Sequence, residues 1–197
     1  MKNKIVIIIV LLIYSNVFCQ EKIKKLYSSI DIEFINPNKV EYYYGLYSTE
    51  YKAIIGGQNK IENTGSSFGI SYSIHYNVFK KLSLGAITGF QNQNNPDFRM
   101  LKLGGSINYF FVDNNNIYAY LNITNNFTLD KTQFKTGTNV RIGIGFPIMK
   151  REKFNLNVNL FYKTNDLILE GTKPLFNSEI PDNIIFRSYG LCLGIKL

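Results

Sequence analysis

The chain has 197 residues, of which 45% are hydrophobic and 18% charged, and its formal net charge is +8 at pH 7. This length fits one domain. A basic chain could bind nucleic acid, but the Lys and Arg residues are scattered and form no basic helix or aromatic-studded strip. We therefore expect no nucleic-acid partner, and lysines in loops and turns, some near anionic lipid, explain the charge more simply.

Residues 1–19 are predicted to be a secretory signal peptide. Two lysines precede an unbroken apolar run at residues 5–14, which is shorter than the ~20 residues that span a bilayer. Val17 and Cys19 stand three positions and one position before a cleavage point, so the mature chain would be residues 20–197. Removing the two lysines lowers the formal charge from +8 to +6.

The predicted cleavage point separates the two cysteines of the chain, Cys19 and Cys192. An alternative makes Cys19 the lipidated first residue of a lipoprotein, which Phe18 disfavours because such signals place a small residue before the cysteine. After cleavage only Cys192 remains, which excludes an intramolecular disulfide.

Apolar residues alternate with small or polar ones along the mature chain, a period of two that is typical of strands with two different faces. In residues 68–78 every second residue is apolar, and the residues between them are Gly, Ser, His and Asn. The same separation recurs in four later segments: residues 101–111, 140–148, 154–162 and 189–197. No mature segment shows a convincing helical period.

Counting back from the C-terminus gives seven predicted strands, at about 66–79, 82–92, 100–112, 117–129, 134–149, 154–168 and 184–197. A membrane barrel with both termini on one side needs an even number, and residues 27–35 are the best candidate for the first strand. Residues 40–55 would then be an extension or hairpin within a long first external loop. A ten-stranded barrel is the alternative, but its two extra strands would be shorter than the ~9–11 residues that a tilted strand needs.

The polar face of these strands separates the possible fold classes, because alternation alone also suits a soluble sandwich or a lipocalin-like barrel. Here the polar positions are mostly Gly, Ser, Thr and Asn, which a narrow lumen accepts but which would not cover a soluble barrel with charge. The predicted fold class is therefore all-β: a transmembrane antiparallel up-and-down β-barrel of about eight strands. Short links at residues 80–81, 113–116 and 150–153 would be periplasmic turns.

Aromatic residues on the apolar face fit the interfacial girdles of such a barrel. Near the predicted periplasmic ends these are Tyr76, Tyr109, Phe111, Phe146 and Phe154. Near the external ends they are Phe68, Phe90, Phe127, Phe134 and Tyr162.

Three segments carry a family resemblance: YNVFKKLSLGAITGF at residues 76–90, LKLGGSINYFF at 101–111 and the closing YGLCLGIKL at 189–197. With the Asn/Lys/Ile-rich composition, they resemble the small outer-membrane β-barrel family of Bacteroidota, related in architecture to OmpX-like and OmpW-like proteins. The resemblance implies a place in the outer membrane of a Gram-negative cell envelope. The closing strand looks like the signal read by the barrel-assembly machinery, although it ends in Leu197 instead of Phe.

No catalytic, cofactor-binding or metal site is predicted, and we expect that the protein is not an enzyme. The only histidine, His75, falls on the lumen face near the periplasmic end, away from the external rim where barrel enzymes meet their substrates. Beside Ser73 and Asn77 it is more typical of a hydrogen-bonded interior residue than of a base. It has no Cys or His partner at metal-ligand spacing.

Five charged residues face the predicted lumen: Asp31, Glu33, Lys102, Arg141 and Lys163. Charges in a narrow lumen are costly unless they are paired, so the acidic residues of the first strand should meet basic residues of later strands. The hypothesis is that Asp31 or Glu33 bonds Arg141 or Lys102 and closes the lumen to ions. A selective ion path is the alternative, but eight strands enclose a space just wide enough for side chains to fill.

Three classes of function remain open at this point. The first is an integral outer-membrane barrel with a structural or interaction role, alone or as a subunit of a larger outer-membrane assembly. The second is a small-solute channel, and the third is a secreted soluble lipocalin-like barrel that binds an apolar ligand. The expected partners are outer-membrane lipid and, through external loops or the lipid face, other proteins.

Overall fold

The computed structural model describes residues 25–61, 64–112, 116–176 and 178–197, so the predicted signal peptide and its cleavage point lie outside the described residues. The described residues form nine strands: β1 (Leu26–Ser48), β2 (Ala53–Lys60), β3 (Ser67–Phe79), β4 (Leu82–Gln93), β5 (Phe98–Phe110), β6 (Tyr118–Thr128), β7 (Thr136–Lys150), β8 (Asn155–Ile168) and β9 (Ile180–Lys196). Within these residues, no helix is long and apolar enough to cross a membrane.

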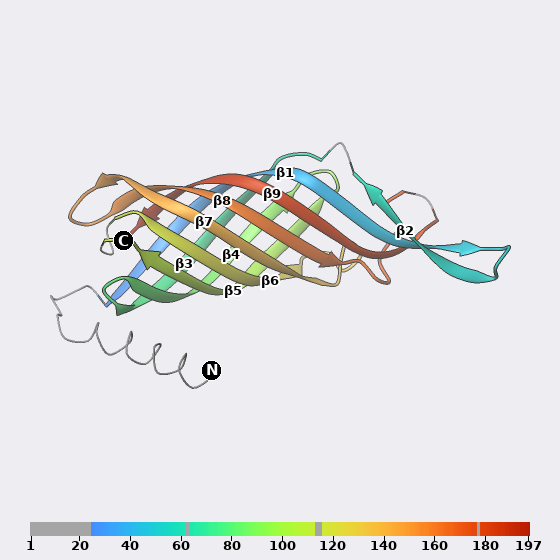
Figure 1. Ribbon diagram of the computed structural model, residues 1–197, viewed down its shortest axis with the longest axis horizontal. Coiled ribbons are helices and arrows are strands. Elements are labelled where there is room, and N and C mark those ends of the chain that lie inside the picture. The colour runs from blue at the N-terminus through green and yellow to red at the C-terminus, as the bar shows by residue number, and fades with distance from the viewer. Residues whose placement is uncertain (1–24, 62–63, 113–115, 177) are drawn as a thin grey trace, which may run out of the picture.

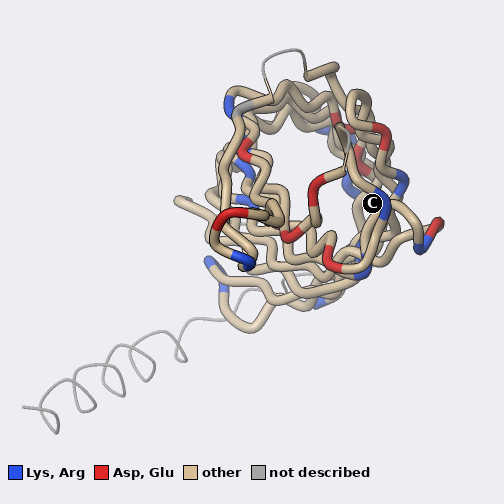
Figure 2. Tube along the Cα trace, turned by 90° about the vertical axis from the view of Figure 1, so that its right-hand side faces the viewer, with Lys and Arg blue, Asp and Glu red and all other residues tan. Residues whose placement is uncertain are grey.

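Eight of the strands close into a ring. Every neighbour in the order β1-β3-β4-β5-β6-β7-β8-β9 pairs antiparallel with the next, and β1 closes the ring by pairing with β9 from Ser29↔Lys196 to Gly45↔Ile180. Figure 2, which looks toward one end of the molecule, shows the ring of strands. The predicted all-β antiparallel up-and-down barrel is confirmed, and the ten-stranded alternative is wrong because β2 stays outside the ring.

The ninth strand, β2, pairs only with the second half of β1, from Glu41↔Lys60 to Ser48↔Ala53. Figure 1 shows this hairpin, the β1–β2 ribbon (residues 41–60), projecting past the barrel. We call that end of the barrel the ribbon end. The opposite end is the terminal end, because Leu197 and Ser28 exchange two backbone hydrogen bonds there, at 2.8 and 3.3 Å. Residues 40–55, which were predicted to be an extension or a hairpin, contain the second half of β1, a turn and the start of β2.

A continuous apolar belt covers the outside of the ring. Each ring strand presents large apolar side chains outward that are 38 to 58% exposed, for example Ile32, Ile70, Leu84, Leu103, Ile123, Ile142, Leu160 and Leu191. Aromatic pairs lie toward the edges of the belt, such as Tyr162–Tyr189 with ring centroids 5.2 Å apart and Tyr109–Phe111 at 5.8 Å. The outside of the barrel therefore has the surface that lipid requires.

Charged groups follow directly above the belt on the ribbon side. Glu41 lies 2.5 Å from Lys39 Nζ and 3.3 Å from Arg187 Nη1 on the neighbouring strand β9. Asn183 donates to Asp166 at 3.2 Å between β9 and β8. The apolar belt thus has a polar upper boundary on these three strands.

The interior is filled in layers, polar along most of the barrel and apolar at the ribbon end. The apolar layer, which we call the apolar cap, consists of Val40, Tyr42, Phe98, Met100, Phe134, Leu167, Leu169, Ile184 and Phe186. Every one of these side chains is at most 2% exposed. The apolar cap therefore fills the ribbon end of the lumen with closely packed side chains.

Phe134 was predicted to lie in the outer aromatic girdle, and this prediction is wrong because Phe134 belongs to the apolar cap. It lies in the loop between β6 and β7, where no ladder enforces alternation, and the loop turns it over the mouth of the lumen. There it packs edge-on against Phe98, with ring centroids 5.9 Å apart, and is fully buried.

Candidate functional site

Glu33 of β1 is the centre of the charged layer inside the barrel. Lys102 of β5 donates to its Oε2 at 2.8 Å, and Arg141 Nη1 of β7 lies 2.8 Å from its Oε1. Ser71 on the adjacent strand β3 donates to the same Oε1 at 2.9 Å. Glu33 is fully buried and both cations are 5% exposed, so three strands far apart in the chain are joined by one carboxylate.

Local strand geometry positions these side chains. Glu33 sits between the outward-facing Ile32 and Phe34, so the period-two alternation of β1 turns it into the lumen. Lys102 and Arg141 face inward for the same reason, and their long side chains reach across the barrel to β1.

Arg141 is held from several sides. Its guanidinium lies over the rings of Tyr120 and Phe161, at 5.5 and 5.0 Å from their centroids, which favours the cation. The Asn122 amide is oriented so that its oxygen accepts from Nη2 and Nε of Arg141 at 2.8 and 3.2 Å. In this orientation its nitrogen donates to Ser106 Oγ at 2.7 Å.

The other two predicted lumen charges are placed differently. Lys163 is 2% exposed and donates to Gln91 Oε1 of β4. Asp31 accepts from three neutral donors: Ser29 Oγ at 3.2 Å, Asn159 Nδ2 at 3.4 Å and Cys192 Sγ at 3.4 Å. Among the described residues, the structure thus brings Lys102 and Arg141 to Glu33 in direct ion pairs, but not to Asp31.

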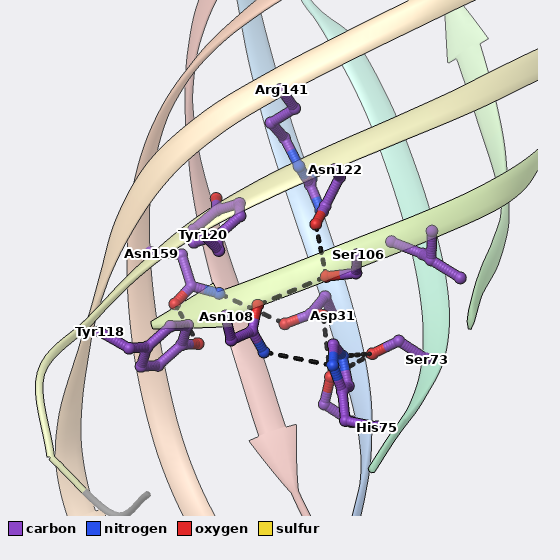
Figure 3. A pocket seen from close by; sticks show the side chains of 12 residues that line it. Asp31, Ser73, His75, Ser106, Asn108, Tyr118, Tyr120, Asn122, Arg141 and Asn159 are labelled. Carbon is purple, nitrogen blue, oxygen red and sulfur yellow. Dashed lines mark hydrogen bonds between the residues drawn. The ribbon is translucent and has the colours of Figure 1, made fainter. Parts of the chain in front are cut away.

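The polar layer nearer the terminal end surrounds Asp31 and His75 (Figure 3). The His75 ring stacks on Tyr27 with centroids 4.9 Å apart, its Nε2 lies 2.9 Å from Ser73 Oγ, and its Nδ1 lies 3.3 Å from Asn108 Nδ2. Within the described residues, no carboxylate hydrogen-bonds this ring. The His75 ring is thus held by three neutral side chains: Tyr27, Ser73 and Asn108.

At the terminal end of the lumen an ammonium group lies over two aromatic rings. Lys196 Nζ lies 4.1 Å from the Tyr27 centroid and 4.9 Å from that of Phe110, which is 1% exposed. Between these rings and the apolar cap, one cavity of about 30 Å³ lies beside Asp31 and another of about 10 Å³ beside Glu33. The first has room for about two waters and the second for about one.

No group of three or more His, Cys, Asp or Glu side chains is placed to hold a metal ion in the part of the chain that the structure describes. The contacts described above in the lumen are hydrogen bonds, ion pairs and cation–ring contacts. What this arrangement can do is join opposite walls of the barrel and fill the space between them.

Sequence reasoning missed the apolar cap, although the sequence does carry a signal for it. On β5 the outward apolar residues are odd-numbered, from Leu101 to Tyr109, whereas Phe98 and Met100 are apolar on the inward, even-numbered phase. Ile184 and Phe186 break the pattern of β9 in the same way. Inward apolar residues that gather at one end of several strands predict a plug at that end.

Comparison with known proteins identifies a shared fold. No family model matches the sequence, and no curated protein matches it significantly. Among solved structures, this chain is similar to the outer membrane protein OprG from Pseudomonas aeruginosa. The match covers 87% of this chain and 95% of the OprG chain, with 12% sequence identity and a TM-score of 0.50. The match to the outer membrane protein AlkL covers 91% of this chain and 93% of the AlkL chain, with 13% sequence identity and a TM-score of 0.50. The match to Neisserial surface protein A covers 86% of this chain and 97% of that protein's chain, with 16% sequence identity and a TM-score of 0.43.

Proposed function

We propose that the protein is an integral outer-membrane β-barrel with a closed lumen and a structural or interaction role, alone or as a subunit of a larger outer-membrane assembly. One observation carries the proposal: an uninterrupted apolar belt surrounds a lumen that the Glu33 ion pairs and the apolar cap fill. The fold shared with OprG and AlkL, which are described as outer membrane proteins, supports the location. Signal-peptide cleavage after Cys19 and an origin in Bacteroidota are part of the proposal and rest on the sequence alone.

The terminal end would face the periplasm, and the ribbon end the outside of the cell. The turns from β3 to β4 and from β7 to β8, both at the terminal end, are short, whereas the ribbon and the β8–β9 connection lie at the other end. Short periplasmic turns and longer external loops are the rule in barrels of this class.

The β1–β2 ribbon supports the interaction role. Among the described strands, β2 pairs only with β1, so its other edge is available to a partner strand. The ribbon also exposes five large apolar or aromatic side chains: Leu46, Tyr47, Tyr51, Ile54 and Ile55. Exposed apolar groups on an external element of a membrane protein favour binding of another protein.

The two alternative functions fit the structure less well. A channel needs a water-filled path, which the apolar cap and the Glu33 network both block. A lipocalin-like barrel has an apolar interior and a polar exterior, the reverse of the distribution seen here.

Membrane fractionation tests the proposal. The mature chain should stay in the outer-membrane pellet after carbonate and high-salt washes, require detergent for release, and migrate faster on gels when it is not heated. Release by carbonate alone would overturn the membrane assignment and favour the soluble barrel.

A further inference from the structure

A cavity of about 230 Å³ lies at the ribbon end, outside the lumen. It is formed between the base of the ribbon and the connection from β8 to β9. The described residues that line it are Tyr44 and Leu46 of β1, Asn59 of β2, and Phe176, Ser178 and Glu179 of the connection. This is a different space from the water-sized cavities around Asp31 and Glu33.

Two aromatic rings form part of the wall of this cavity. Tyr44 and Phe176 both contact Tyr42, with ring centroids 5.3 and 5.7 Å from that of Tyr42. Because Tyr42 is fully buried in the apolar cap, it fixes both rings from below. Phe176 is itself 54% exposed, so the cavity is accessible from solvent.

Glu179 supplies the charge. The residue is 6% exposed, and its Oε1 accepts from Tyr42 Oη at 3.2 Å and from the Phe176 backbone nitrogen at 2.8 Å. These two bonds place the carboxylate beside the aromatic wall. Among the described lining residues, Glu179 is the only one with a formal charge.

We propose that this pocket binds a small organic cation, with its ammonium group against the Tyr44 and Phe176 rings and near the Glu179 carboxylate. Aromatic faces and a carboxylate both attract a cation, and aromatic cages of this kind are a known means of recognising quaternary ammonium groups. The volume is below the ~300–1,000 Å³ of sites for drug-sized molecules, so the ligand has few heavy atoms. The site is independent of the closed lumen and adds a ligand class to the proposed role.

Choline and its neutral carbon isostere 3,3-dimethylbutan-1-ol test this proposal directly. Binding of each to the purified full chain in detergent micelles is measured by saturation-transfer NMR and isothermal calorimetry. Choline should bind saturably, and the neutral alcohol should bind at least about tenfold more weakly. Equal binding of the two, or no saturable choline binding, would overturn the proposal.

Two variants locate the site. Glu179→Gln should weaken choline binding about tenfold, whereas Glu170→Gln, an exposed carboxylate of the same connection that pairs with Lys135 at 3.7 Å, should leave it unchanged. Phe176→Leu, a change at a half-exposed ring, should weaken binding about threefold and keeps the test valid if Glu179→Gln fails to fold. If Phe176→Leu folds and binds choline as well as the unaltered chain does, the cation is not in this pocket.

Discussion

Glu33 Oε1 lies 2.8 Å from Arg141 Nη1 across the lumen, while the other oxygen of the same carboxylate accepts from Lys102 at 2.8 Å. One acid on β1 is therefore the shared ion-pair partner of two cations, from β5 and β7. Removing the acid would leave both cations without their ion-pair partner inside the barrel.

The Glu33–Arg141 pair should show strong coupling in a double-mutant cycle. Glu33→Gln alone should destabilise the barrel by roughly 3–5 kcal/mol, because it leaves two buried cations without their ion-pair partner, whereas Arg141→Gln should cost less because Glu33 keeps Lys102. The double variant should cost less than the sum of the two, with a coupling of about 0.5–3 kcal/mol. Urea unfolding of the chain refolded in lipid vesicles measures these differences.

An exposed ion pair is the control for that cycle. Glu170 and Lys135 lie 3.7 Å apart and are both more than half exposed, so Glu170→Gln should change stability by less than about 1 kcal/mol. Small and additive effects for the Glu33–Arg141 pair as well would show that the lumen charges do not hold the barrel together.

If the apolar belt faces lipid, a charge placed on the outer face should lower the free energy of unfolding by an amount that depends on its depth in the bilayer. Leu103→Arg places a guanidinium in mid-strand at a side chain that is 57% exposed, and should cost ~2–4 kcal/mol in lipid. Val112→Arg, just beyond β5 at the terminal end, should cost ~0–1 kcal/mol. Equal costs at the two positions in vesicles would argue against a lipid-facing belt.

Ser106→Arg on the same strand should destabilise for a different reason. Ser106 is buried beside Asn108 and Asn122, so an arginine there crowds the lumen and competes with Arg141. Its cost should therefore be the same in short-chain and long-chain lipid vesicles, unlike that of Leu103→Arg. A cost that follows bilayer thickness would place Ser106 on the lipid face instead.

The apolar cap should contribute to stability like a soluble core. Phe186→Ala removes a ring that is 1% exposed and packs edge-on against Phe98 at 6.0 Å, so it should cost about 3–5 kcal/mol. Phe68→Ala on the outer face, where the ring is 46% exposed, should cost less. Thermal unfolding followed by heat-modified gel migration compares the two, and equal costs would mean that the cap is not tightly packed.

The ribbon should be dispensable for the barrel and required for its partner. Gly45 and Gly56 face each other in the β1–β2 register, and the pairing of β1 with β9 ends at Gly45. Replacing residues 46–55 by Asn-Gly, a two-residue hairpin turn, should therefore leave unfolding unchanged. Proteins that co-purify with the full chain from mild-detergent membranes should be lost. Unchanged co-purification would assign the partner surface elsewhere.

Much of the fold could be predicted because alternation in strands determines which face each residue occupies. The outward placement of Ile32 and the inward placement of Glu33 both follow from it. The sequence left open whether Asp31 or Glu33 pairs with Arg141 and Lys102, since the tilt and stagger of a closed ring decide which inward residues share a layer. Asp31 is two residues away on the same face, about 6.6 Å along the strand, and lies instead in the layer of Asn159 and Cys192.

The apolar cap was the part least accessible to sequence reasoning. Phe134 and Leu169 lie outside the strands, so the period-two pattern says nothing about their direction. The pocket at Glu179 depends in the same way on how the β8–β9 connection folds over the ribbon. Both features come from loops whose conformation is set by tertiary packing.

Planar-bilayer conductance tests the central claim, a membrane barrel closed by its own side chains, most directly. The purified chain is inserted into the bilayer, and insertion is verified on matched vesicles by protection of the barrel from protease. We expect no current steps above the lipid background over ±100 mV in about 1 M KCl, because the Glu33 network and the apolar cap both fill the lumen. Discrete, reproducible current steps from the inserted chain would contradict the closed lumen and assign the protein to the channels.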